Sequence, residues 1–351
     1  MCDVKSKNIA IVIAAAFASV AVADQASGDM AGGVTVPHSG VRYATDAYPG
    51  FDNESNIINP SRKTPRWFSF ITGPSCQNAA EQWAYCSNLV QGGSIRRACR
   101  QLDALVREWP TSPEAPKAQR LLGELYLNEL KQTENAFEEF KYLIDFYSMQ
   151  CGYAATANEL YQIANLMLLE GKEIMFIRFE NTVDVRRAYE ACVLRAPGAK
   201  WVPEAMLTIG ALRVKEGKFG EAVSVYENLR NIYPQAPESK VSLLREAEAR
   251  MQLLDDHAYN RERNRDTIDF LKIALVSCRE EDAEILRSYL VDAEKRREAE
   301  AWKSTVFYDS PTRTKRSAAG AYEKYLRDYP DGLHAEEAKA RLAELKGGSG
   351  K

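Results

Sequence analysis

The chain has 351 residues, of which 45% are hydrophobic and 27% charged, so it can bury a substantial core and is not disordered by composition. Its formal net charge of −3 at pH 7 provides no basic footprint for binding nucleic acid. The abundant charged residues are therefore interpreted as solvated faces of helices.

Residues 1–23 have the pattern of a secretory signal peptide. Two lysines near the start form a basic region, residues 9–20 form an apolar stretch, and Ala21-Val22-Ala23 is a small-residue cleavage site. The apolar stretch is shorter than the roughly 20 residues needed to span a bilayer. Cys2 precedes this stretch, so a lipid attached to a cysteine at the cleavage site is not expected. We expect cleavage after Ala23 and an exported chain.

Residues 24–77 differ in character, because five prolines and a Gly-Gly pair are scattered through a polar sequence. No helical period persists there, which predicts an extended or disordered leader. Within the leader, residues 66–70 (Arg-Trp-Phe-Ser-Phe) form an aromatic cluster. We favour a strap that packs on the first helix over the alternative, a docking motif for a partner or a membrane interface.

From residue 78 to residue 346, apolar residues recur at intervals of three to four, which predicts consecutive helices. Five helix pairs and a C-terminal capping helix are expected, followed by a flexible tail at residues 347–351. A long helix over residues 283–303, paired with a helix over residues 314–329, is an alternative fifth pair, so the count is open by one. The five expected pairs cover residues 81–108, 112–147, 154–194, 205–234 and 238–277, and the capping helix covers residues 335–346.

The clearest pair extends from Ala205 to Pro234. Gly210 precedes Ala222 by 12 residues, Tyr226 follows four later and Pro234 eight after that. This spacing resembles the tetratricopeptide repeat, abbreviated TPR. Small residues at Gly210 and Ala222 suit a close crossing of two antiparallel helices. The predicted fold is therefore all-α, a right-handed α-solenoid; weaker copies of the spacing contain Ala98 and Leu102, Gly123 and Phe140, Ala188 and Cys192, and Ala318 and Tyr322.

The sequence shows no recognisable catalytic chemistry. His38, His257 and His334 are far apart and lack the spacing of a zinc site. Phosphate-loop, dinucleotide-binding and nucleophile-elbow motifs are absent from the sequence. We therefore predict that the chain is not an enzyme, and we assign no catalytic, cofactor-binding or metal residues.

Six cysteines would remain after removal of the signal peptide, an even number that permits disulfides in an exported protein. A bridge between Cys86 and Cys99, on the two helices of one pair, is the first to consider. However, Cys86 and Cys192 occupy small-residue positions of the repeat, where a free thiol packs as a small apolar group. Burial of free thiols is the favoured interpretation.

Several junctions between helix pairs share a pattern in which an aromatic-proline pair ends one helix and a small polar residue precedes the next. Residues 109–115 (WPTSPEA) and 329–335 (YPDGLHA) show it, and the run at residues 307–308 and 318–326 is also similar. Together with the helix pairs behind a signal peptide, these features resemble the BamD family, also called YfiO, of outer-membrane β-barrel assembly lipoproteins. The resemblance covers residues 78–346.

The resemblance implies a non-enzymatic periplasmic scaffold at the inner face of the outer membrane. Its implied partners are a BamA-like barrel protein and unfolded outer-membrane proteins, and its membrane association would be indirect. The chain departs from the family in lacking a lipobox and in its long proline-rich leader. The alternative is a soluble periplasmic TPR adaptor in cell-envelope or cell-wall organisation.

In a TPR array the first helix of each pair lines the concave face, through template positions 2, 5, 9 and 12. On the first two helix pairs, these positions hold an aromatic residue, aliphatic residues and two cations. Such a surface suits an extended segment with apolar side chains and a free or acidic end, such as the C-terminal strand of an unfolded barrel protein. An equally weighted alternative is that Trp83 packs beneath Trp67 and Phe68 of the leader. The candidate peptide-binding groove consists of Trp83, Ser87, Val90, Lys117, Arg120, Glu124 and Leu127.

Overall fold

The computed structural model describes residues 50–51, 57–58, 73–170, 172–174, 177–179, 182–256, 261–310 and 313–347. The signal peptide, most of the leader with its aromatic cluster at residues 66–70, and the end of the tail lie outside these residues. The same holds for His38 and His257. The chain divides into two compact units, Met1–Leu169 and Glu170–Lys351, which are described separately.

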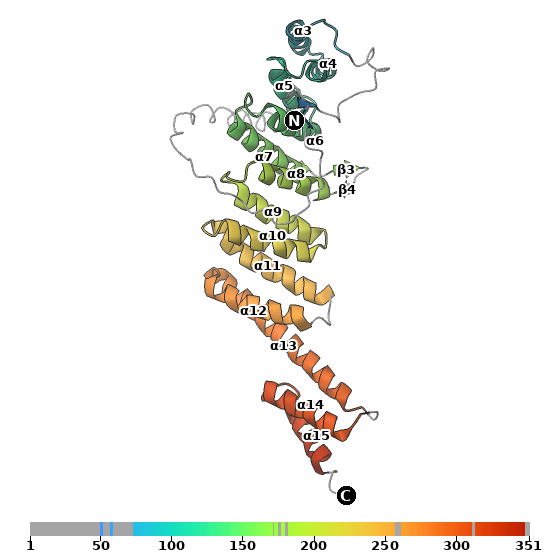
Figure 1. Ribbon diagram of the computed structural model, residues 1–351, viewed down its shortest axis with the longest axis vertical. Helices are drawn as coiled ribbons and strands as arrows, with labels where there is room; N and C mark the ends of the chain where they lie inside the picture. The colour runs from blue at the N-terminus through green and yellow to red at the C-terminus, as the bar shows by residue number, and fades with distance from the viewer. Residues whose placement is uncertain are drawn as a thin grey trace, which may run out of the picture. The chain divides into compact units, whose positions relative to one another are not determined.

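The described part of unit 1 is a row of consecutive helices (Figure 1). Among the first four helices, neighbours in sequence pack against each other. Asn78 caps the first helix by accepting a hydrogen bond from the Glu81 backbone N–H at 2.9 Å. Gly93, with a φ of 71°, makes the first turn. The helices are α3 (Ala79–Gln91), α4 (Ile95–Glu108), α5 (Ala115–Asn128), α6 (Thr133–Tyr147) and α7 (Tyr153–Glu170).

Unit 2 continues with eight α-helices among its described residues (Figure 1). Consecutive helices pack together, and α9 also contacts α11, as α11 contacts α13. The 3-10 turn Glu280–Asp282 precedes α13. The helices are α8 (Thr182–Arg195), α9 (Val202–Lys215), α10 (Phe219–Ile232), α11 (Pro237–Asp256), α12 (Arg261–Ser277), α13 (Ala283–Tyr308), α14 (Lys315–Asp328) and α15 (Ala335–Gly347).

The helical prediction is confirmed, with one correction. Counted along the described residues, the helices make six successive pairs and a final single helix, one pair more than the expected five and within the count that the sequence leaves open. Two short antiparallel strand pairs, which the sequence did not predict, are also present: β1 (Gly50–Phe51) with β2 (Ile57–Ile58), and β3 (Lys172–Ile174) with β4 (Ile177–Phe179). The β3–β4 pair lies between α7 and α8, where isoleucine and phenylalanine favour strands.

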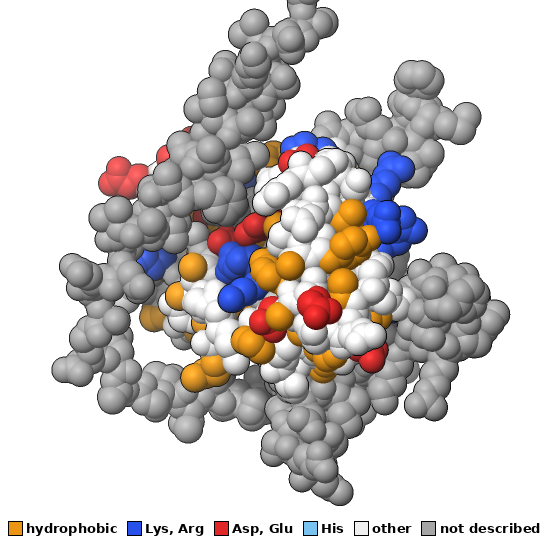
Figure 2. All heavy atoms as spheres, turned by 90° about the horizontal axis from the view of Figure 1, so that it is seen from above, with side chains coloured by type: hydrophobic (Ala, Val, Ile, Leu, Met, Phe, Trp, Pro, Cys, Tyr) orange, Lys and Arg blue, Asp and Glu red, His pale blue; other side chains and the backbone are white. Residues whose placement is uncertain are grey.

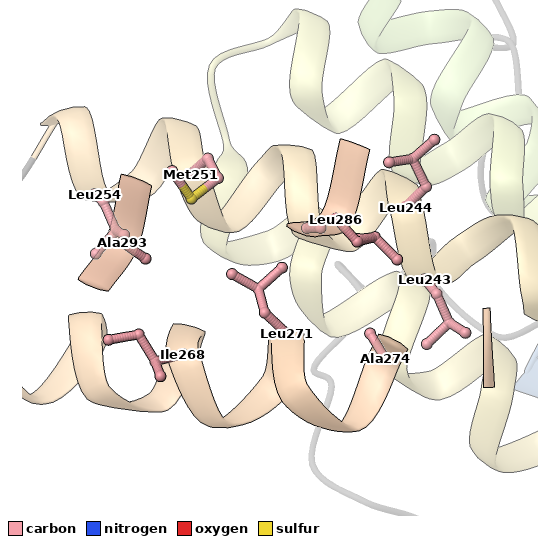
Figure 3. Close-up of a cluster of buried hydrophobic side chains, with 10 residues drawn as sticks. Leu243, Leu244, Met251, Leu254, Ile268, Leu271, Ala274, Leu286 and Ala293 are labelled. Carbon is pink, nitrogen blue, oxygen red and sulfur yellow. The ribbon is translucent and has the colours of Figure 1, made fainter. Parts of the chain in front are cut away.

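A buried cluster of unit 2 joins three helices. Ile268, Leu271 and Ala274 of α12 are completely buried and meet apolar side chains of α11 and α13 (Figure 3). Their spacing of three residues places them on one face of the helix. The end of the molecule seen from above in Figure 2 carries charged side chains of both signs among hydrophobic ones.

Glycine is required where two helices approach closely. A Cβ atom on Gly210 of α9 would lie 2.3 Å from Cε1 of the Tyr226 ring on α10. The same relation recurs in unit 1, where a Cβ on Gly123 would lie 2.8 Å from Cε2 of the Phe140 ring. At both helix crossings, the absence of a Cβ atom at the glycine position therefore leaves the room that the aromatic ring occupies.

The cysteines Cys76, Cys86, Cys99, Cys151, Cys192 and Cys278 are free thiols in the structure. The bridge considered between Cys86 and Cys99 is therefore not formed, and the favoured interpretation is confirmed for Cys86 and Cys192, whose side chains are buried. Burial raises the pKa of Cys86 and Cys99 to about 11 and that of Cys192 to about 12. These buried thiols pack as small apolar groups and are poor nucleophiles at neutral pH.

No helix in the described part of the chain combines the length and hydropathy needed to cross a membrane. In the same residues, no group of three or more His, Cys, Asp or Glu side chains is placed to hold a metal ion.

Candidate functional site

A pocket of about 710 Å³ lies in unit 1 between the start of α5, the turn before it and the end of α6. Three prolines, Pro110, Pro113 and Pro116, form one side of the pocket. Three aromatic residues of α6, Tyr142, Phe146 and Tyr147, form another side. The remaining lining residues are Thr111, Ser112, Lys117, Arg120, Leu143, Gln150 and Cys151.

The pocket walls are fixed by local hydrogen bonds and ring packing. The Tyr147 hydroxyl donates to the Pro110 carbonyl oxygen at 2.9 Å, which ties the end of α6 to the turn. Tyr142 and Phe146 are one helical turn apart, and their rings stack with centroids 4.2 Å apart. These contacts give the pocket a preformed aromatic side.

The turn ends three residues later than the sequence suggested. Ser112 was expected to begin the helix, whereas α5 begins at Ala115. The Ser112 hydroxyl oxygen accepts a hydrogen bond from the Ala115 backbone N–H at 3.2 Å. The hydroxyl therefore stabilises the turn that enters the helix.

Arg120 connects α5 to α7. Its guanidinium lies 2.8 Å from the Glu159 carboxylate, and it donates to Thr156 Oγ1 at 2.7 Å and to the Cys151 carbonyl oxygen at 3.0 Å. These bonds hold the side chain in place and offset its charge. Lys117, one turn earlier on the same helix, is exposed at the pocket.

The residues that line this pocket include two cations and no carboxylate. Because Arg120 is already paired, Lys117 is the lining cation that stands exposed to solvent. The pocket therefore combines apolar walls with a cation, an arrangement that suits an apolar or aromatic side chain next to a carboxylate.

The predicted groove residues divide into two groups. Lys117 and Arg120 line the pocket, whereas Trp83, Ser87 and Val90 of α3 and Glu124 and Leu127 of α5 do not. All five in the second group are half-buried. The Ser87 hydroxyl donates to the Trp83 carbonyl oxygen at 2.9 Å, within α3 itself. Trp67 and Phe68, the alternative neighbours of Trp83, lie outside the described residues.

The aromatic residues of α6 were not predicted, because the repeat template places binding residues on the first helix of each pair, and α6 is a second helix. Two signals were available. Pro110, Pro113 and Pro116 recur every third residue, and Tyr142 and Phe146 have the i, i+4 spacing of neighbours on one helix face.

Glu124 lies beside the pair formed by Arg120 and Glu159. Burial raises its pKa, Arg120 lowers it and Glu159 raises it, with a net upward shift. The folded state therefore holds the proton more tightly than the unfolded chain, so ionisation of Glu124 lowers stability as pH rises through the folded-state pKa.

We therefore expect Glu124→Gln to raise the melting temperature at pH 7. At a pH below the ordinary carboxyl pKa of 4.5, Glu124 is protonated in both states and the advantage should disappear. Thermal unfolding followed by circular dichroism at the two pH values checks this. A lower melting temperature for Glu124→Gln at pH 7 would contradict it.

Comparison with known families finds a match for the helix pair of unit 2 that extends from Ala205 to Pro234 in the sequence. Residues 204–236 match the family model for the tetratricopeptide repeat. This helix pair is similar to a tetratricopeptide repeat. The matched residues contain α9 and α10, where Gly210 contacts Tyr226. The predicted tetratricopeptide spacing of this helix pair is therefore confirmed.

Solved structures similar to the chain include two TPR proteins. One is the C-terminal part of a TPR repeat-containing protein from Cytophaga hutchinsonii, with 11% identity, a TM-score of 0.29, and coverage of 75% of this chain and 88% of that chain. The other is a tetratricopeptide repeat protein from Parabacteroides merdae, with 13% identity, a TM-score of 0.26, and coverage of 76% and 98%. No curated protein matches the chain.

Proposed function

We propose that this chain is a protein-binding scaffold and that the pocket of unit 1 receives an extended segment of a partner protein. The observation that carries the proposal is the pocket itself, with proline and aromatic walls and with Lys117 and Arg120 as its charged lining residues. An extended peptide places alternate side chains on one side, so one apolar or aromatic residue can enter the pocket. Its free carboxylate would then lie near Lys117.

The finer proposal concerns the cell envelope. The pattern of residues 1–23 and the resemblance to the BamD family support an exported scaffold at the inner face of the outer membrane. Its partners would be a BamA-like barrel protein and unfolded outer-membrane proteins, whose C-terminal strand would supply the segment. Membrane association would be indirect, through these partners. The absence of a lipobox supports the alternative of a soluble periplasmic adaptor in cell-envelope or cell-wall organisation.

The test uses the full chain and a fluorescent ten-residue peptide taken from the C-terminus of a β-barrel outer-membrane protein that ends in an aromatic residue. Lys117→Glu should weaken binding about tenfold, or about 1.4 kcal/mol, because it places a carboxylate beside the peptide carboxylate. An amidated peptide should bind the wild type and Lys117→Glu with similar affinity. Fluorescence anisotropy titrations measure both effects.

Two further variants complete the experiment. Phe146→Ala removes one side of the pocket and should weaken both peptides, with thermal unfolding recorded to show that unit 1 still folds. Arg96→Glu makes the same charge change at an exposed position of α4 that does not line the pocket, and should leave affinity unchanged. Equal loss in Arg96→Glu and Lys117→Glu, or unaltered affinity in Phe146→Ala, would refute the proposed site.

A further inference from the structure

A second pocket, of about 910 Å³, lies in unit 2 along α9, α11 and α13. Ala211 and Val214 of α9 line it, directly after the glycine position of the repeat. Thirty-four residues further on, at the usual TPR period, Arg245 and Glu248 of α11 line it as well. Equivalent positions on the first helices of two successive pairs therefore line one groove.

The groove has an aromatic and apolar floor. Tyr226 is almost completely buried, and burial raises its pKa to about 12, so it remains neutral at physiological pH. Tyr289 packs against the buried cluster of α11, α12 and α13 while it also lines the groove. Of these two rings, the half-buried Tyr289 offers an apolar surface to a side chain entering from solvent.

The charges of this groove differ from those of the unit 1 pocket. Three carboxylates and two guanidinium groups line it. Arg245 lies 3.0 Å from the Glu248 carboxylate. Arg296 lies between two carboxylates, 2.9 Å from Asp292 and in contact with Asp255. Both guanidinium groups are thus paired inside the groove, and the lining retains an excess of negative charge.

The carboxylates can accept further hydrogen bonds. Each carboxylate has about four acceptor sites, and the side chains of Asp255 and Asp292 are each about half exposed, at 53% and 48%. Arg296 neutralises only one of the two negative charges of Asp255 and Asp292. A second cation near these carboxylates would neutralise the other. The aromatic floor beside it suits an apolar side chain.

We propose that the unit 2 groove is a second peptide-binding site, and that it selects an extended segment of another protein in which a lysine or arginine is flanked by apolar residues. The two units would then bind segments of opposite charge, a carboxylate end at unit 1 and a basic side chain at unit 2. This site is independent of the one proposed for unit 1, since neither its lining residues nor its charge preference are shared.

The probes are two fluorescent ten-residue peptides of alternating leucine and serine that differ in a single central residue, lysine or glutamate. Both are acetylated and amidated, so neither presents a terminal carboxylate to Lys117. In the wild-type chain the lysine peptide should bind about tenfold more tightly than the glutamate peptide. Equal affinity for the two peptides would overturn the proposal.

Two sets of variants test the location. Asp255→Asn combined with Asp292→Asn leaves one carboxylate against two guanidinium groups, so the preference should reverse in favour of the glutamate peptide. Both residues form partly exposed ion pairs, which contribute little to stability, so the variant should fold. The control is Asp266→Asn, which removes an exposed charge on α12 outside the groove. This variant should keep the wild-type preference for the lysine peptide.

The second test changes the shape of the groove and leaves its charges unaltered. Ala211 is exposed at the groove, so Ala211→Trp fills the groove without overpacking the core and should abolish binding of both peptides. Retained binding in Ala211→Trp, or a reversal in Asp266→Asn equal to that of the double variant, would place the site elsewhere. Lys117→Glu should change none of these affinities, so failure at unit 1 and failure at unit 2 are distinguishable.

Discussion

Gly210→Ala should destabilise unit 2 by about 1–3 kcal/mol, the usual cost of overpacking a tight contact. The added methyl group would lie 2.3 Å from Cε1 and 2.5 Å from Cζ of the Tyr226 ring, which is almost completely buried. Alanine normally stabilises a helix relative to glycine by about 1 kcal/mol. A loss of stability in Gly210→Ala would therefore be opposite in sign to the effect of helix propensity alone.

The matched control is Gly320→Ala in the interior of α14, where a Cβ atom has no neighbour within 4 Å. This change should be stabilising by about 0.5–1 kcal/mol. Urea unfolding of the full chain, followed by circular dichroism, compares the two variants. If both glycines respond with the same sign, the close crossing of α9 and α10 is not what requires Gly210.

A double variant identifies the partner of Gly210. The first repeat carries Cys86 at the glycine position and Leu102 at the aromatic position, a larger residue opposite a smaller one. Tyr226→Leu should therefore recover part of the loss caused by Gly210→Ala, so that the double variant is more stable than the sum of the two single effects predicts. Strict additivity would show that the ring and the glycine do not interact.

Glu246→Ala should have the largest effect of any single change considered, about 3–5 kcal/mol. The Glu246 side chain is completely buried on α11 and pairs with both Arg230 of α10 and Arg250 of α11. These two guanidinium groups also lie over the Phe270 ring of α12, at 5.6 and 4.6 Å from its centroid. Removal of the carboxylate leaves two partly buried cations near the same ring without the anion that both of them contact.

Glu248→Ala, two residues further along α11, is the control. Glu248 is partly exposed and pairs with the exposed Arg245, so its loss should cost no more than about 1 kcal/mol. Thermal unfolding, together with hydrogen exchange of the amides of α10 to α12, measures both variants. Similar losses for the two glutamates would mean that burial of Glu246 does not determine its contribution.

The helix pairs could be predicted from sequence because their signals are local. Apolar spacing, Gly217 with its φ of 72° in the turn between α9 and α10, and the Gly210, Ala222 and Tyr226 phases all act within about 20 residues. The β3–β4 pair was not predicted, because two strands of three residues give too short an alternation to recognise.

The candidate site was predictable only in part, because its residues come from more than one helix. The count of concave positions found Lys117 and Arg120, but the aromatic wall belongs to α6 and the partners of Arg120 to α7 and the turn before it. Glu159 follows Arg120 by 39 residues, and no local pattern marks such a pair. Tertiary packing thus gives Arg120 a connecting role that its repeat position did not reveal.

The central claim, a scaffold that binds envelope proteins through the unit 1 pocket, is tested most directly by site-specific photo-crosslinking. A photoreactive residue is placed at Lys117, with Arg96 as the control position, and the full chain is isolated from envelope fractions after irradiation. We predict adducts at position 117, and not at position 96, with a BamA-like barrel protein or with unfolded outer-membrane proteins. Adducts solely with cell-wall proteins, or identical adducts at both positions, would contradict the account.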